Sequence, residues 1–244
     1  MLSYEKTIDE IVSQNPSLAI LPIGSVEQHG AHLPTGTDWY IASALGRKVA
    51  ERIEGYLLPA LPVSTCREHM GKKGSVWMDP DIFYNMILSM VNSLKEQGFR
   101  RVLTLQCHGG IFILPPAVRQ ANALHNPELM MVNIDFGVMP KELTGYGAGE
   151  IHAGDTETSL MLHIAPETVH MERAVASWPT VPRPYLNYGS VFRASPSGVW
   201  GDPTIATAEK GKEILEQMAA WAVQEAEKAF SYMQEKEKFG YSYF

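Results

Sequence analysis

The segment that decides the fold is Leu18-Ala-Ile-Leu-Pro-Ile-Gly-Ser-Val-Glu-Gln-His-Gly-Ala-His-Leu-Pro-Thr-Gly-Thr-Asp38. Its first part, 18–23, is an apolar run with the length of a buried strand. Polar residues begin where this run ends, and a helical pattern begins at Asp38. Because sites in open α/β sheets lie at the carboxyl ends of strands, the acids and histidines of 24–38 are the first candidates for a functional site.

Three of these residues have the chemistry of metal ligands. Glu27 and His29 are two residues apart, so both side chains point the same way if the segment is extended. A carboxylate and an imidazole together suit zinc, manganese or iron. Asp38 follows a turn rich in Gly and Pro and can fold back toward the same point. The alternative is that Asp38 only caps the helix that follows it and that Glu27 and His29 are solvated.

Helical and extended patterns alternate along the rest of the chain. We expect helices at 4–14, 38–54, 79–97, 115–125, from 155 or 156 onward and at 207–236, and strands at 18–23, 57–63, 102–105 and 129–134. This alternation predicts a parallel sheet with helices on both faces. Pro59 and Pro62 make the second strand irregular or place it at an edge. The segments 64–78 and 166–205 have no regular pattern, and the first has the length of a binding loop or lid.

Composition limits the class of protein. A length of 244 residues fits one domain, 1–244. The net charge of -7 and the lack of a basic cluster argue against nucleic-acid binding. No apolar stretch approaches the ~20 residues that span a bilayer, and the N-terminus lacks the pattern of a signal peptide. Cys66 and Cys107 form no disulfide framework, so we expect a cytoplasmic protein.

Two further motifs carry polar residues where regular elements begin or end. Gln106-Cys-His-Gly-Gly110 follows the strand predicted at 102–105, which leaves His108 at its carboxyl end and Cys107 as a possible nucleophile. Ile151-His-Ala-Gly-Asp-Thr-Glu-Thr-Ser159 precedes an apolar run, so Glu157 falls in the first turn of a helix, either in the site or as a partner of the helix dipole. His152 lies on the loop side, as a pocket residue would.

Taken together, these motifs resemble the creatininase (creatinine amidohydrolase) family. The family's signature loop is matched by 24–38, its His-Gly-Gly by 108–110, its His-Ala-Gly-x-x-Glu-Thr-Ser by 152–159 and its Gly-Asp-Pro by 201–203. The resemblance implies a three-layer α/β/α sandwich with a mostly parallel central sheet. It also implies a hydrolase with two divalent metal ions per chain, often assembled as a homohexamer.

The resemblance also implies roles for individual residues. The expected metal ligands are Glu27, His29, Asp38, His108 and Glu157, with Asp38 bridging. In creatininase itself a glutamate stands two residues after the strand-end histidine, where this chain has Gly110, and we expect Glu157 to replace it. The expected catalytic residues are His152, as the general acid, and Glu157. His32, His69 and Gly109 are expected to line the substrate site, unless His32 only orients a ligand and His69 lies on a mobile surface loop.

The implied reaction is hydrolysis of the C–N bond of a small cyclic or linear amide, such as a creatinine-like compound, a lactam or a formamide. A hydroxide shared by two zinc, manganese or iron ions would attack the carbonyl carbon. Gln106 and Ile111 stand where the family often has Asn, which favours a substrate other than creatinine. The alternatives are hydrolysis of a C–C bond in a cyclic diketone of the inosose type, a non-catalytic metal-binding oligomer, and a cysteine hydrolase that uses Cys107.

Overall fold

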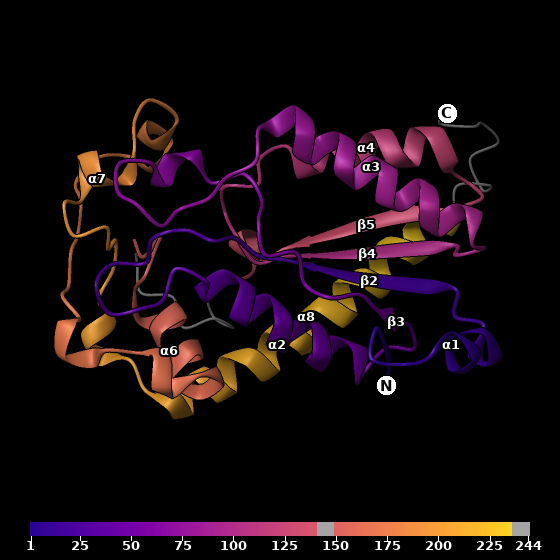
Figure 1. The fold of residues 1–244 in the computed structure, drawn as a ribbon, viewed down its shortest axis with the longest axis horizontal. Helices are drawn as coiled ribbons and strands as arrows, with labels where there is room; N and C mark the ends of the chain where they lie inside the picture. Colours follow the sequence, from indigo (N-terminus) through magenta and orange to yellow (C-terminus); the bar gives the residue numbers. More distant parts are fainter. Residues whose placement is uncertain (141–148, 236–244) are drawn as a thin grey trace.

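A five-stranded parallel sheet forms the centre of the computed structural model, which describes residues 1–140 and 149–235 (Figure 1). The strands are β1 (Leu2–Ser3), β2 (Leu18–Ile23), β3 (Tyr56–Leu57), β4 (Arg101–Gln106) and β5 (Met130–Asp135). Their order in the sheet is β1-β3-β2-β4-β5, and all neighbouring pairs are parallel. The predicted α/β fold with a mostly parallel sheet is confirmed.

Helices cover both faces of this sheet. They are α1 (Ile8–Gln14), α2 (Thr37–Ala50), α3 (Pro80–Glu96), α4 (Leu114–His125), α6 (Asp155–Ile164), α7 (Val191–Ala194) and α8 (Ala208–Gln234). Figure 1 shows α3 and α4 on one face and α2 and α8 on the other. The three-layer α/β/α sandwich is therefore confirmed. In the described part of the chain, none of the helices combines the length and apolar character needed to cross a bilayer.

The alternation of side chains along β2 explains the two layers of core. Leu18 and Ile20 pack in the cluster formed with α2, α6 and α8, while Leu21 and Ile23 pack in the cluster formed with α3 and α4. All six residues of β2 are buried. A strand buried on both faces must be apolar throughout, which is why 18–23 is a continuous apolar run.

The connections place a topological switch point between β2 and β4. From β2 the chain passes through α2 to β3 on one side, and from β3 it returns through α3 to β4 on the other side of β2. Loops that leave the carboxyl ends of two such strands diverge and leave a crevice between them. The loop after β2 contains Glu27 and His29, and the loop after β4 contains His108.

Several predicted boundaries are wrong. The strand predicted at 57–63 is regular only at Tyr56–Leu57, because Pro59 and Pro62 lack the N–H that a ladder needs. The helix predicted at 38–54 ends at Ala50. The helix predicted at 4–14 begins at Ile8, because Thr7 and Glu10 form a capping box there. The strand β1 was not predicted. Two parts of the sequence lie outside the described residues. They are most of the segment 137–150, which is rich in glycine, and Lys236 at the end of the last predicted helix.

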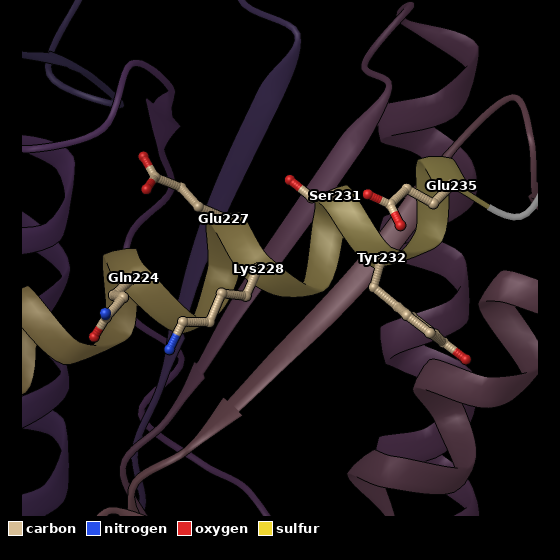
Figure 2. A pocket seen from close by; sticks show the side chains of 6 residues that line it. All are labelled: Gln224, Glu227, Lys228, Ser231, Tyr232 and Glu235. Carbon is tan, nitrogen blue, oxygen red and sulfur yellow. The ribbon is translucent and has the colours of Figure 1, made fainter.

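A shallow hollow on the outer surface of α8 is lined by Gln224, Glu227, Lys228, Ser231, Tyr232 and Glu235 (Figure 2). These side chains come from α8 and from Glu235, the residue that follows it. None of the candidate metal-ligating groups of the described residues lies there. The candidate metal-ligating groups lie instead around the switch point between β2 and β4.

Candidate metal centre

The start of α2 is held directly against the end of β2. A Cβ at Gly24 would lie 2.6 Å from the backbone oxygen of Asp38, so only glycine permits this contact without displacement. The N-cap of α2 is Gly36, and Asp38 lies in the first turn with its carboxylate directed at two histidines. The alternative that Asp38 only caps the helix is therefore wrong.

One cluster of donor atoms joins Glu27, Asp38 and His108. The Nδ1 atom of His108 lies 3.1 Å from Oε2 of Glu27 and 3.2 Å from Oδ2 of Asp38. All three residues are buried. Burial opposes the charged form of His108, but the carboxylates around it outweigh burial and hold its pKa well above the ordinary value.

A second cluster joins His29, Asp38 and Glu157. The Nδ1–H of His29 donates to the backbone oxygen of Glu27, and Nε2 lies 3.2 Å from Oδ1 of Asp38 and 3.8 Å from Oε2 of Glu157. Burial lowers the pKa of His29, but Asp38 and Glu157 reverse this and raise it to about 10. The two clusters share Asp38, with one of its oxygens facing each histidine.

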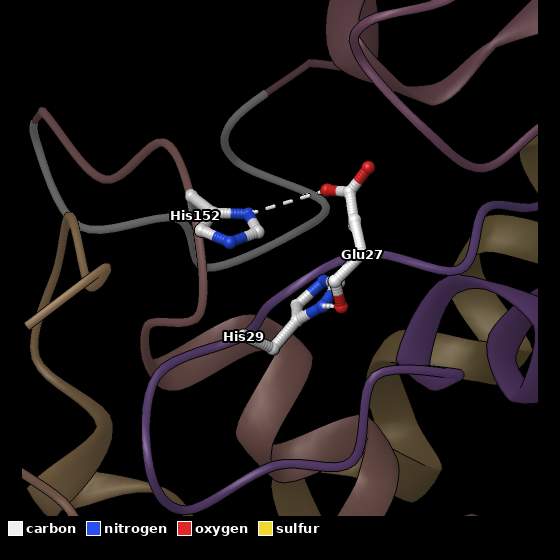
Figure 3. A group of neighbouring side chains, drawn as sticks. All are labelled: Glu27, His29 and His152. Carbon is white, nitrogen blue, oxygen red and sulfur yellow. Dashed lines mark hydrogen bonds and ion pairs between the residues drawn. The ribbon is translucent and has the colours of Figure 1, made fainter. Parts of the chain in front are cut away.

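The third cluster contains Glu27, His29 and His152 (Figure 3). The Nε2–H of His152 donates to the backbone oxygen of Gln28 at 2.7 Å. Its Nδ1 atom is therefore free of a proton and lies 3.8 Å from Oε1 of Glu27. Burial holds the pKa of His152 well below its ordinary value, so the ring is neutral.

The buried atoms of this centre fit divalent cations. Both carboxylate oxygens of Glu27, Oδ2 of Asp38 and Nε2 of His29 are buried and make no hydrogen bond within the described residues, although ion-pair distances join them. Buried polar atoms that make no hydrogen bond are costly, and divalent cations would bind all of them. Carboxylate oxygen and imidazole nitrogen are the donor set of zinc, manganese and iron sites.

A cavity of about 740 Å³ opens onto the centre. Of the predicted site residues, it is lined by Glu27, His69, His108, Gly109, His152 and Glu157. Its outer walls come from 67–70 and from 183–191. The cavity therefore gives small molecules access to three of the predicted ligands, Glu27, His108 and Glu157, and to both predicted catalytic residues, whereas His29 and Asp38 do not line it.

His32 does not line this cavity, contrary to our expectation. It is buried, and its Nε2 atom lies 3.0 Å from the hydroxyl of Thr158 on α6. Burial lowers the pKa of His32 to about 4, so the ring is neutral. Its place is structural, because it joins the signature loop to the helix that carries Glu157.

His69 is buried and not on a mobile surface. Its Nε2 atom lies 3.1 Å from Oε1 of Glu27. The side-chain amide of Gln28 donates to its Nδ1 atom, so the proton of the ring is on the nitrogen that faces Glu27. Sequence reasoning missed Gln28, which fixes the ring of His69 through its side chain and that of His152 through its backbone oxygen.

Cys107 does not have the environment of a nucleophile. It is absent from the cavity lining, and its Sγ atom contacts the backbone oxygen of Leu105. Burial raises the pKa of this thiol well above its ordinary value, which keeps it protonated and unreactive.

Comparison with known proteins identifies the family. The family model described as creatinine amidohydrolase (Creatininase) matches residues 4–226. The chain belongs to the creatininase family. It is 35% identical over 224 residues to a mycofactocin precursor peptide peptidase of Mycobacterium ulcerans (strain Agy99), which covers 87% of this chain and 85% of the relative. This family membership makes the protein a hydrolase with the fold of metal-dependent amidohydrolases.

Other proteins to which this chain is similar have different named activities. The chain is 29% identical to a 3-dehydro-scyllo-inosose hydrolase of Thermotoga maritima, covering 82% of this chain and 73% of the relative. It is 26% identical to a creatinine amidohydrolase of Pseudomonas putida, covering 86% and 89%. A crystal structure of creatinine amidohydrolase superposes with a TM-score of 0.79 at 25% identity, covering 94% of this chain and 98% of that one.

The carboxylate of Glu68 occupies the space beside Gly110. A Cβ at this position would overlap the carboxylate of Glu68, which lies on the short 3-10 helix η1 (Arg67–His69). Oε1 of Glu68 lies 3.3 Å from Nε2 of His108, the nitrogen that faces away from Glu27 and Asp38. Glu68 thus fills the space of a missing side chain and holds the ring of His108. Sequence reasoning did not single out Glu68, although the glycine at 110 indicated free space.

We expect Glu68→Ala to weaken metal binding, because it removes the contact between Glu68 and His108 and loss of such an outer partner typically costs about 10–100-fold in metal affinity. Gly110→Ala is expected to weaken it more, because its Cβ would overlap both the Glu68 carboxylate and Nε2 of His108. The double variant is then expected to be little worse than Gly110→Ala, because that change already disturbs the same contact. Zinc titration of the metal-free proteins measures this. Additive losses in the double variant would show that the two changes act independently.

Proposed function

We propose that this protein is a metal-dependent amidohydrolase that cleaves the C–N bond of a small cyclic or linear amide. The main support is the pair of donor clusters that share Asp38 beside the cavity. One relative is named as a peptide peptidase and another as a creatinine amidohydrolase, and both names describe cleavage of an amide C–N bond.

Two divalent ions per chain would be held by residues already described. Glu27, Asp38 and His108 would hold one, and His29, Asp38 and Glu157 the other. Bound divalent ions polarise a carbonyl group and make water acidic near neutral pH. Related creatininase structures are described as a manganese form and as a Zn-Zn type, which supports manganese or zinc over other metals.

The chain's own residues supply proton transfer and orientation. His152 is neutral, and its unprotonated Nδ1 atom is directed toward Glu27. It takes up at Nδ1 the proton that the attacking water loses and gives it to the leaving nitrogen as the C–N bond breaks. The backbone oxygen of Gln28 fixes the ring in this tautomer. His69 lines the cavity next to Glu27 and excludes water from that side.

A second candidate function is hydrolysis of a C–C bond in a cyclic diketone. It is favoured by the likeness to the 3-dehydro-scyllo-inosose hydrolase of Thermotoga maritima. The same centre would polarise a ketone, and His152 would protonate a carbon instead of a nitrogen. A non-catalytic metal-binding oligomer is the remaining alternative.

A substrate screen tests these functions. The panel contains short peptides, lactams, formamides and cyclic diketones, each incubated with protein loaded with zinc, manganese or iron. We expect turnover of at least one amide class by the wild type and none by Glu27→Gln. Turnover of diketones alone would favour the second candidate. Metal binding without any turnover would favour the non-catalytic one.

Chelation is expected to abolish the activity found in this screen, and Cys107→Ser is expected to keep it. Without metal the carbonyl is not polarised, whereas the half-buried, protonated thiol of Cys107 has no part in the reaction. Initial rates before and after dialysis against a chelator, and after readdition of zinc or manganese, measure the first effect. Activity that survives chelation but is lost in Cys107→Ser would establish a cysteine hydrolase.

We also propose a small-molecule substrate and a homo-oligomer, with a hexamer as the state that the family resemblance implies. The apolar side chains of Ile8 and Val12 on α1 are 69% and 67% exposed, which is consistent with a contact between subunits. Sedimentation analysis measures the mass of the assembly. The cytoplasmic location stays a prediction.

A further inference from the structure

Arg183 lies beside the metal centre although it is far from it in the sequence. It begins the short 3-10 helix η5 (Arg183–Asn187), which lines the cavity. Its Nη2 atom lies 3.0 Å from the point that a Cβ of Gly109 would occupy. Gly109 follows His108 directly, so the absence of a side chain there lets the guanidinium group rest against the backbone next to the centre.

The charge of Arg183 has no counterpart within the described residues. Arg47 pairs with Glu5 and Arg52 pairs with Glu216, whereas Arg119 on α4 is unpaired among the described residues but lies outside the cavity. Arg67, the other arginine of the cavity, lies 3.6 Å from Asp79. No ion pair or hydrogen bond of this kind involves Arg183, which is exposed at the cavity wall.

The acidic residues that line the cavity do not pair with Arg183, because each of them has other partners. Glu27 and Glu157 belong to the donor clusters, and Glu68 contacts His108. Two divalent ions would offset the charges of these three carboxylates and of Asp38, so that the unpaired guanidinium of Arg183 adds a net positive charge at the cavity wall. A positive cavity with low-dielectric walls attracts an anionic substrate.

We propose that Arg183 binds a carboxylate group of the substrate, and this inference rests on the proposed amidohydrolase function. The planar guanidinium group matches a carboxylate with two parallel hydrogen bonds. The substrate class is then an amide that carries a free carboxylate close to the scissile C–N bond, such as a short peptide or an N-acyl amino acid. Arg183 is the residue that distinguishes this class from neutral amides.

Matched hydroxamates test the proposal through binding, without need of turnover. The hydroxamate group binds divalent metals, and malonic, succinic and glutaric monohydroxamates place a carboxylate at three distances from it. Their primary-amide counterparts have the same shape without the charge. Calorimetric titration of the zinc-loaded protein gives Kd for each pair in the wild type, in Arg183→Met and in Arg119→Met, which removes an exposed arginine of α4 outside the cavity.

We expect at least one acid to bind about 10-fold more tightly than its amide in the wild type and in Arg119→Met. In Arg183→Met the preference disappears, while the amides bind as before. Equal preferences in the wild type and Arg183→Met, or no preference at any chain length, would overturn the proposal and leave the amidohydrolase function standing. If no hydroxamate binds to the zinc-loaded wild type, the metal centre and the proposed function fail together with this inference.

Discussion

Asp38→Asn is expected to lower kcat/KM by roughly 10³-fold and to leave fewer than about one metal ion per chain. Asp38 is the residue that both donor clusters share, with Oδ1 facing His29 and Oδ2 facing His108 at 3.2 Å each. An amide keeps the shape but offers one neutral oxygen in place of two charged ones. Both clusters are therefore weakened by this single change, which is why its expected effect exceeds that of changes at Glu68.

Metal analysis after dialysis and steady-state kinetics measure the two effects. Asp81→Asn is the matched control, because Asp81 also lies in the first turn of a helix but is exposed. We expect it to keep the full metal content and activity. An Asp38→Asn protein that retains about two ions and full activity would show that the clusters do not share this carboxylate.

Gly211→Ala is expected to destabilise the protein by roughly 3 kcal/mol. Gly211 lies in the first turns of α8, and a Cβ there would overlap the backbone oxygen of Ser159 on α6. Backbone atoms cannot rotate away, so the two helices would have to separate. Helix propensity alone predicts the opposite sign, since alanine is favoured over glycine in a helix by about 1 kcal/mol.

Thermal unfolding of the metal-free protein measures this effect, and a fall in Tm of roughly 6–12 °C is expected. Gly36→Ala is the control, because a Cβ at Gly36 would meet only the ring of Tyr40, at 3.7 Å, and φ there is -90°. Loss of stability in that variant should stay below about 1 kcal/mol. A Gly211→Ala protein as stable as the wild type would show that α6 and α8 are not held together at this point.

Much of the fold could be predicted because the core is arranged in a regular way. The strand 18–23 was predicted to the residue, since a strand buried on both faces has an apolar run as long as itself. The helix α3 was predicted to within one residue at each end, because Pro80 begins it and Gly98 follows it. By contrast, β1 consists of two residues paired with β3, which is too short for any periodic pattern to form.

The candidate site could be predicted where its residues lie in local motifs. Glu27 and His29 belong to one loop, and the structure brings both of them close to Asp38, and His29 close to Glu157 as well. His32 lies in the same loop but outside the cavity. Its position could not be predicted, because the local sequence does not show which side of the loop faces the crevice.

The amino-acid sequence by itself determined the layered fold and the kinds of donor atom at the carboxyl ends of β2 and β4. Periodicity and turn chemistry are local properties, so they can be read from neighbouring residues. Only the tertiary structure decided that Glu68 fills the space at Gly110, that Arg183 rests against Gly109 and that Gly211 admits the backbone of α6. Each of these is a contact between segments distant in the chain, and its energy depends on packing that no local pattern encodes.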